Sequence, residues 1–117
     1  AYKELLSSAG RIAIGSDFPV ESIAPLLGFY AAVSRKDLNG FPEGGFQIEN
    51  ALTREEALKG MTIWAAYANF EDRIKGSIEP GKYADFIILD KDIMTIPIGE
   101  VPKVSVLKTY IGGERVY

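Results

Sequence analysis

A chain of 117 residues has room for one domain with a real core, and 47% hydrophobic against 25% charged residues excludes the composition of a disordered protein. The 13 basic and 16 acidic residues are interspersed and give a formal charge of -3, which excludes a basic stripe for a nucleic-acid backbone. Histidine and cysteine do not occur, so this chain alone cannot build a disulfide, a Ser-His-Asp triad, a Cys-His pair or a histidine-rich zinc site.

The first part of the chain predicts a helix, a strand and a second helix. Residues 2–9 place apolar side chains at helical spacing and are followed by Gly10, a residue type favoured just after the last turn of a helix. Residues 11–15 form a short apolar run typical of buried parallel strands, and the chain turns polar directly after it. Residues 25–34 again have helical spacing. This order predicts an α/β fold.

A long loop and a strongly marked helix are expected next. Residues 35–52 are rich in glycine and have few periodic apolar positions, which predicts a surface loop of a length that often carries function. Thr53 can cap a helix with its hydroxyl, and Glu56 can reach back to the Thr53 N–H in a capping box. A helix with one apolar face is therefore expected from Thr53 onward.

The remaining residues predict strands. Residues 84–89 are largely apolar, and residues 103–111 alternate between two faces. Gly112 and Gly113 suit a two-residue primed turn into a return strand over residues 114–117. The end of the chain is therefore expected to be a β-hairpin.

The residue patterns at the two ends of the chain give different expectations about the neighbouring sequence. Because the last residues close a hairpin, Tyr117 is expected at or near a natural C-terminus. The strand at 11–15 needs parallel neighbours on both sides, so further residues are expected before Ala1.

Residues 76–82 have the spacing of a phosphate-binding P-loop up to Lys82. Tyr83 stands where a magnesium-binding Ser or Thr is required, Pro80 removes an amide donor, and Glu79 would repel phosphate. An apolar strand also follows where a helix should begin. These residues are predicted to form a turn that leads into the strand at 84–89.

Asp17 is the residue that most invites a chemical role. It lies just past an apolar strand and before a helix, where α/β folds and barrels place their sites, and a carboxylate there can bind a metal or accept a proton from water. The alternative is that Ser16 and Asp17 only satisfy N–H groups in the turn before Pro19. The residue pattern alone favours the turn.

Arg35 is a second candidate, for binding substrate. It opens the long loop together with Lys36 and Asp37 and could reach a bound molecule. Exposed charges after a helix are more often solvated and suit the negative end of the helix dipole.

Several stretches of the sequence resemble the amidohydrolase superfamily, and within it amidohydrolase family 3, which includes enzymes of the N-substituted formamide deformylase type. They follow one another in order along essentially the whole chain and comprise residues 15–20, 25–28, 31–35, 52–58 and 75–85.

The resemblance implies a fold and a site. It implies that the chain is a C-terminal fragment of a metal-dependent hydrolase TIM barrel, with the last βα unit and the following helix in residues 1–75 and strands of a small β-sandwich in residues 76–117. It also implies that Asp17 ligates or lies beside the catalytic metal and acts as a base toward the metal-bound water. A barrel needs about 250 residues, and the family's histidines are absent from this chain, so the fragment alone is expected to be inactive.

The expected function is therefore that of a parent enzyme, a metal-dependent amidohydrolase that uses metal-activated water to hydrolyse a non-peptide C–N bond of amide type. The expected cofactor is a divalent metal, zinc, held by the parent and not by the fragment. The alternative is a noncatalytic α/β domain that binds a partner through exposed strand edges.

Partners and location follow from the same reasoning. A small amide-type substrate and a homo-oligomeric parent are expected, without nucleic acid or membrane, because no apolar run approaches the roughly 20 residues that span a bilayer. The start of the chain lacks the layout of a signal peptide, which predicts a cytoplasmic protein.

Overall fold

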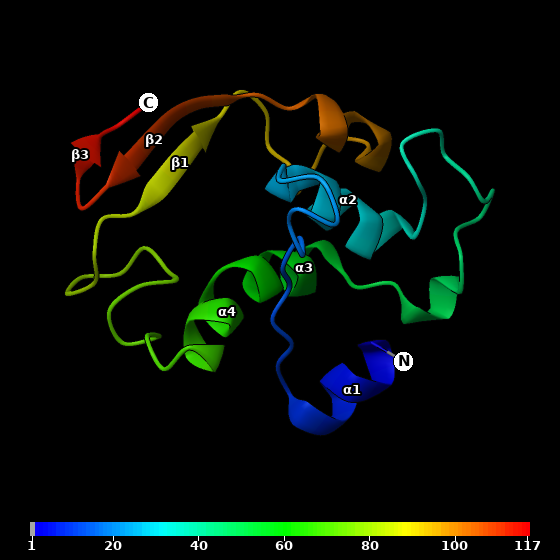
Figure 1. The fold of residues 1–117 in the computed structure, drawn as a ribbon, viewed down its shortest axis with the longest axis horizontal. Helices are drawn as coiled ribbons and strands as arrows, with labels where there is room; N and C mark the ends of the chain where they lie inside the picture. Colours follow the sequence, from blue (N-terminus) through cyan, green and yellow to red (C-terminus); the bar gives the residue numbers. More distant parts are fainter. Residues whose placement is uncertain (1) are drawn as a thin grey trace.

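The computed structural model describes residues 2–117 and contains helices in the first part of the chain and a small sheet at the end (Figure 1). The α-helices are α1 (Tyr2–Ala9), α2 (Pro25–Ser34), α3 (Arg54–Met61) and α4 (Ile63–Ala68). The strands are β1 (Phe86–Leu89), β2 (Val106–Ile111) and β3 (Glu114–Arg115), and two 3₁₀ helices are η1 (Ile48–Asn50) and η2 (Ile98–Lys103). No helix in the described part of the chain is long and apolar enough to cross a membrane.

The hydrophobic core lies around α2. This helix packs against η2 on one side and α3 on the other, as Figure 1 shows. Phe29 of α2 and Val101 of η2 are fully buried. The buried cluster consists of Leu6, Phe29, Tyr30, Leu52, Ala57, Ile93, Val101 and Val104. Residues from α1 to the segment before β2 therefore share one core.

The predicted capping box is confirmed, but the predicted single helix is divided in two. The Glu56 N–H donates to Thr53 Oγ1 at 3.1 Å, and the Thr53 N–H donates to a Glu56 carboxylate oxygen at 2.8 Å. Helix α3 then ends, because Thr62 adopts φ -124° and ψ -96° and its hydroxyl donates to the Leu58 carbonyl at 2.7 Å. Threonine competes with the helical ladder in this way, and α4 starts afresh at Ile63.

The predicted C-terminal hairpin is confirmed with shorter strands. The sheet is antiparallel in the order β1-β2-β3, and Gly112 and Gly113 have φ of 57° and 83°, as a primed turn requires. Strand β2 starts later than predicted because η2 occupies the residues before it, and β3 has only two residues. Phe86 of β1 pairs with Tyr110 of β2, and their rings stack with centroids 4.6 Å apart.

The segment 11–15 lies in no strand of the described chain, contrary to the prediction. Its side chains alternate between half-buried, at Ile12 and Ile14, and exposed, at Ala13. A parallel strand forms its hydrogen bonds with neighbouring strands. The segment 11–15 has no such neighbour within residues 2–117, because the sheet there is antiparallel and consists of β1, β2 and β3. The division of the chain into a barrel part, residues 1–75, and a sandwich part, residues 76–117, stays a prediction.

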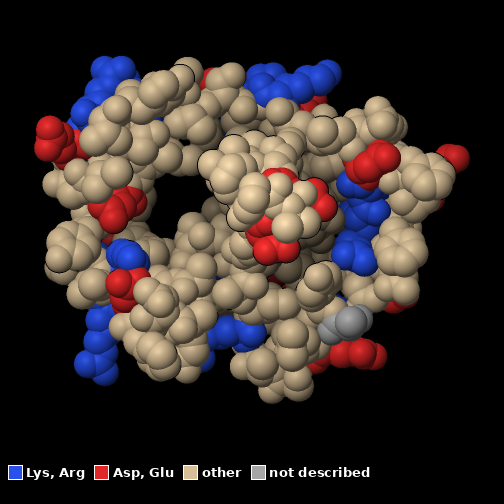
Figure 2. Space-filling model, in the orientation of Figure 1, with Lys and Arg blue, Asp and Glu red and all other residues tan. Residues whose placement is uncertain are grey.

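A hollow of about 840 Å³ separates α3 and α4 from the start of the sheet. It is visible left of the centre of the face in Figure 2. Large apolar side chains are also exposed, among them Ile78, which lines the hollow, and Phe70 and Val20, which do not; they are 83%, 95% and 77% exposed. Exposed apolar surface of this extent is typical of surfaces that other protein covers.

Candidate functional site

Asp17 lies in a tight turn directly after the segment 11–15. Its φ is 55°, a left-handed conformation that Asp tolerates better than most residues and that is uncommon outside glycine. The Asp17 carbonyl accepts from the Val20 N–H at 2.8 Å, and Ser16 Oγ accepts from the Phe18 N–H at 3.3 Å. The predicted turn is thus present, and it is made by the Ser16 side chain and the Asp17 backbone.

The Asp17 carboxylate is not used by that turn. The residue is exposed, and among residues 2–117 its side chain has no hydrogen-bond or ion-pair partner. Both oxygens are therefore available to a ligand or to water. Within the same residues no three His, Cys, Asp or Glu side chains lie close enough together to hold a metal ion. A protein metal site usually has three or more protein ligands. Asp17 can therefore supply only one carboxylate ligand of such a site.

Two small cavities follow the segment 11–15 along one side of α2. The first, of about 230 Å³, lies at the turn and is lined by Ile14, Gly15, Ser16, Pro25, Gly28 and Met61. The second, of about 310 Å³, shares Ile14, Gly15 and Gly28 with the first and extends to Tyr2 and Arg35. The polar end of the first cavity is Ser16, so a molecule bound there would lie beside the Asp17 turn.

Arg35 is the C-cap residue of α2 and fastens the long loop to that helix. Its φ is 56°, its N–H donates to the Ala31 carbonyl at 2.9 Å, and its carbonyl accepts from the Phe46 N–H at 2.8 Å. The side-chain Nε donates to the Phe46 carbonyl at 3.0 Å, and the guanidinium lies 5.8 Å from the ring centroids of Tyr2 and Phe46. The sequence did not predict this structural role.

The structure does not bring the two predicted site residues together. Asp17 precedes α2 and Arg35 follows it, and no hydrogen bond or ion pair joins their side chains. One cavity lies beside the Asp17 turn and the other extends to Arg35. The two cavities share the lining residues Ile14, Gly15 and Gly28.

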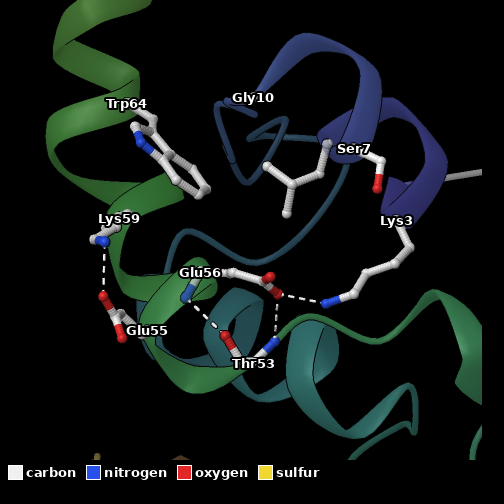
Figure 3. Close-up of a pocket in the computed structure, with 9 residues that line it drawn as sticks. Lys3, Ser7, Gly10, Thr53, Glu55, Glu56, Lys59 and Trp64 are labelled. Carbon is white, nitrogen blue, oxygen red and sulfur yellow. Dashed lines mark hydrogen bonds and ion pairs between the residues drawn. The ribbon is translucent and has the colours of Figure 1, made fainter.

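A further pocket, of about 460 Å³, lies between α1 and α3 and was not predicted (Figure 3). Lys3 of α1 donates to the Glu56 carboxylate at 2.7 Å, and Lys59 pairs with Glu55 at 2.6 Å. The hydrogen bond from Lys3, followed by that from the Thr53 backbone, lowers the pKa of Glu56 below its ordinary value. Because the charged side chains pair with one another, we interpret this pocket as a packing contact between two helices and not as a reactive site.

The turn predicted in place of a P-loop is confirmed. The Lys82 N–H donates to the Glu79 carbonyl at 3.2 Å, and the Lys82 ammonium contacts Ser77 Oγ at 2.7 Å and the Glu79 carboxylate at 3.0 Å. The lysine is therefore engaged by its own turn, and β1 follows where a P-loop would open a helix.

Comparison with known proteins decides the family. The family model described as "Amidohydrolase family" matches residues 1–117. The chain belongs to the amidohydrolase family. The amidohydrolase segment described above is 33% identical over 115 residues to N-substituted formamide deformylase of Arthrobacter pascens, covering 98% of this chain and 21% of that protein. It is 36% identical over 116 residues to the protein LONG AFTER FAR-RED 3 of Arabidopsis thaliana, covering 99% of this chain and 19% of that one.

A solved structure supports the fold of this amidohydrolase segment. An amidohydrolase from Thermotoga maritima MSB8 superposes with a TM-score of 0.73 at 24% identity, over 99% of this chain and 25% of that one. The chain thus spans about a fifth of the length of the curated relatives and a quarter of the structural one.

Proposed function

We propose that this amidohydrolase segment is the C-terminal portion of a metal-dependent enzyme that hydrolyses a non-peptide C–N bond of amide type with metal-activated water. The observation that carries the proposal is the Asp17 carboxylate, which is exposed and has no partner among residues 2–117, at the end of the segment 11–15. A relative of 33% identity is named as a deformylase of N-substituted formamides, which supports an amide-type substrate.

Asp17 has two tasks in this proposal. As a ligand, its carboxylate would hold the metal together with residues outside this chain, because the described residues supply no other nearby ligand group. As a base, it accepts a proton from the attacking water and then delivers that proton to the leaving nitrogen. The divalent metal, zinc in this proposal, supplies when bound the polarisation that makes water nucleophilic near neutral pH.

Arg35 is proposed to bind substrate from the second cavity. Its Nε is engaged by the Phe46 carbonyl, whereas its remaining guanidinium N–H groups have no hydrogen-bond partner among residues 2–117. These groups could donate to an oxygen of a small substrate in the cavity that Arg35 lines. A cytoplasmic, homo-oligomeric parent without nucleic-acid or membrane partners stays a prediction.

The proposal is tested by substituting Asp17→Asn in the complete enzyme. The amide cannot accept a proton, so turnover of an N-substituted formamide should fall roughly 10²–10⁴-fold, as for loss of a general base. Asp72→Asn is a matched control, because Asp72 makes no side-chain hydrogen bond within the described chain and lies away from both cavities. Unchanged turnover of the Asp17 variant would remove the assigned role.

One observation favours a different function. The outer edge of β1 and the outer edge of the short β3 have no strand partner within residues 2–117. A noncatalytic domain that binds an extended peptide by adding a strand would use such edges. This function would be preferred if the complete natural protein showed no hydrolysis of amides with any divalent metal and yet bound a peptide through the β1 edge.

A further inference from the structure

We propose that Gly60 is a positioning residue for Asp17, because its missing side chain lets the segment 11–15 lie directly on α3. This inference rests on the function proposed for Asp17. Gly60 is the penultimate residue of α3, and glycine is a poorer helix former than alanine. A reason other than helix formation therefore explains its presence.

The reason is the closeness of the segment 11–15. A Cβ added to buried Gly60 would lie 2.7 Å and 2.9 Å from Cδ1 and Cγ1 of Ile14 and 3.0 Å from the Ile12 carbonyl oxygen. The two contacts under 3.0 Å force the Ile14 side chain to shift. The 3.0 Å contact is with backbone, which would have to give by a few tenths of an ångström and cannot swing away as a flexible side chain does. Any side chain at position 60 would therefore displace the segment.

The contact is also a backbone hydrogen bond. The Ile14 N–H donates to the Gly60 carbonyl at 3.0 Å. Helix α3 ends at Met61, so the Gly60 carbonyl is among the last four of its helix, which lack an amide partner in the same helix. The break at Thr62, which the sequence did not predict, thus provides the acceptor that holds the segment.

The start of the segment is held by the next helix. The Arg11 guanidinium lies 4.1 Å from the ring centroid of Tyr67 in α4. Together the contacts of Arg11 and Ile14 hold the extended segment along α3 and α4, and Asp17 lies two residues after its end. A shift at Ile14 is therefore passed to the turn that carries the Asp17 carboxylate.

Gly60→Ala should slow catalysis by the complete enzyme. Misplacing a catalytic group by about 1 Å can cost on the order of 10²-fold in rate. Gly60→Ala should lower kcat by about 10- to 100-fold because it misplaces a base. KM should change less than kcat, because Ile12 and Ile14 are only part of the lining of the cavity assigned to substrate. Gly99→Ala is the control, since a Cβ there meets nothing within 4 Å.

A second readout does not depend on activity. In the metal-free complete enzyme, Gly60→Ala should speed amide hydrogen exchange of residues 11–17 at least about 5-fold, because it weakens the Ile14–Gly60 hydrogen bond. Gly99→Ala should leave this exchange unchanged. Unaltered exchange and unaltered kcat in the Gly60 variant would overturn the inference.

Rescue separates a specific contact from general damage. Ile14→Ala removes the two closest atoms, so adding it to Gly60→Ala should restore protection of residues 11–17 and recover kcat to within about 5-fold of Ile14→Ala alone. If Gly60→Ala does not fold, folding of the double variant supports the proposal and its failure overturns it.

Asp17→Asn assayed in parallel keeps the two proposals distinct. If Asp17→Asn retains turnover, the proposed function of Asp17 fails whatever the Gly60 variants do. If Asp17→Asn loses turnover but Gly60→Ala changes neither kcat nor exchange, only the positioning role of Gly60 fails.

Discussion

Glu56 makes two separate stabilising contacts. It completes the capping box at the start of α3, and it accepts the hydrogen bond of Lys3 that docks α1. The capping box is visible in the sequence because its partners are close along the chain. The contact with Lys3 is not, because it depends on how α1 returns to α3 in space.

Substitutions at Glu56 should separate these two contributions. Glu56→Gln keeps an acceptor at the helix start but loses the charge, so α1 should be less stable by under about 1 kcal/mol, the usual value of a partly exposed ion pair. Glu56→Ala loses both and should cost about 1–2 kcal/mol. Amide hydrogen exchange in the complete protein measures the two effects separately, at residues 2–9 for the docking of α1 and at residues 54–61 for the capped helix α3. Protection of α3 that is equal in both variants would contradict the argument.

The same residue predicts an acid dependence. The pKa of Glu56 is lowered from its ordinary value of 4.5 in the folded state. Its stabilising contribution is therefore fully present above about pH 4.5 and is lost as the pH falls through the lowered pKa. Protection of α1 should decrease over that acid range in the wild type and less in Glu56→Gln. Equal pH dependence in both proteins would show that another group is responsible.

Elements defined by local signals were predictable from the sequence, whereas those that depend on distant neighbours were not. The capped start of α3 and the turn at Gly112-Gly113 use residues adjacent in the chain, and both are confirmed. The segment 11–15 has the pattern of a buried strand but has no strand neighbour in residues 2–117. The break at Thr62 was not predictable, because the apolar residues keep helical spacing on both sides of it.

The hairpin turn allows a test of this local control. Gly113 has φ 83°, and an added Cβ would meet only the Ala84 Cβ at an ordinary 3.8 Å, so the cost of Gly113→Ala should come from the backbone alone. About 1–2 kcal/mol is expected for a left-handed alanine, with Gly113→Asn less affected. Exchange of the β2 amides reports the loss. Gly99→Ala is the control, and a Gly113→Ala hairpin as protected as the wild type would contradict the argument.

The candidate site was predictable only in part. The position of Asp17 after an apolar run was visible in the sequence, and the structure adds that its carboxylate has no partner among residues 2–117. The fastening of the loop by Arg35 was not predictable from the sequence, because its partner Phe46 lies across a loop with no regular pattern. The roles of Asp17 and Arg35 in catalysis and binding stay proposals.

The whole molecule exposes more apolar surface than a self-contained domain should. The open hollow beside α4 and the exposed Phe70 and Ile78 are features that further protein would cover. The isolated 117-residue chain is therefore expected to self-associate and to bind a hydrophobic dye, whereas the complete enzyme should do neither at this surface. Sedimentation and dye fluorescence measure both, and a monodisperse, dye-free chain would favour a self-standing domain.

The most direct test of the account is metal-dependent amide hydrolysis by the complete enzyme. The protein is stripped with a chelator, zinc is returned, and hydrolysis of an N-substituted formamide is followed in the wild type and in Asp17→Asn. Stripping should abolish turnover, zinc should restore it in the wild type, and Asp17→Asn should stay at least about 10²-fold slower at saturating zinc. Turnover that survives stripping, or that zinc restores equally in both proteins, would contradict it.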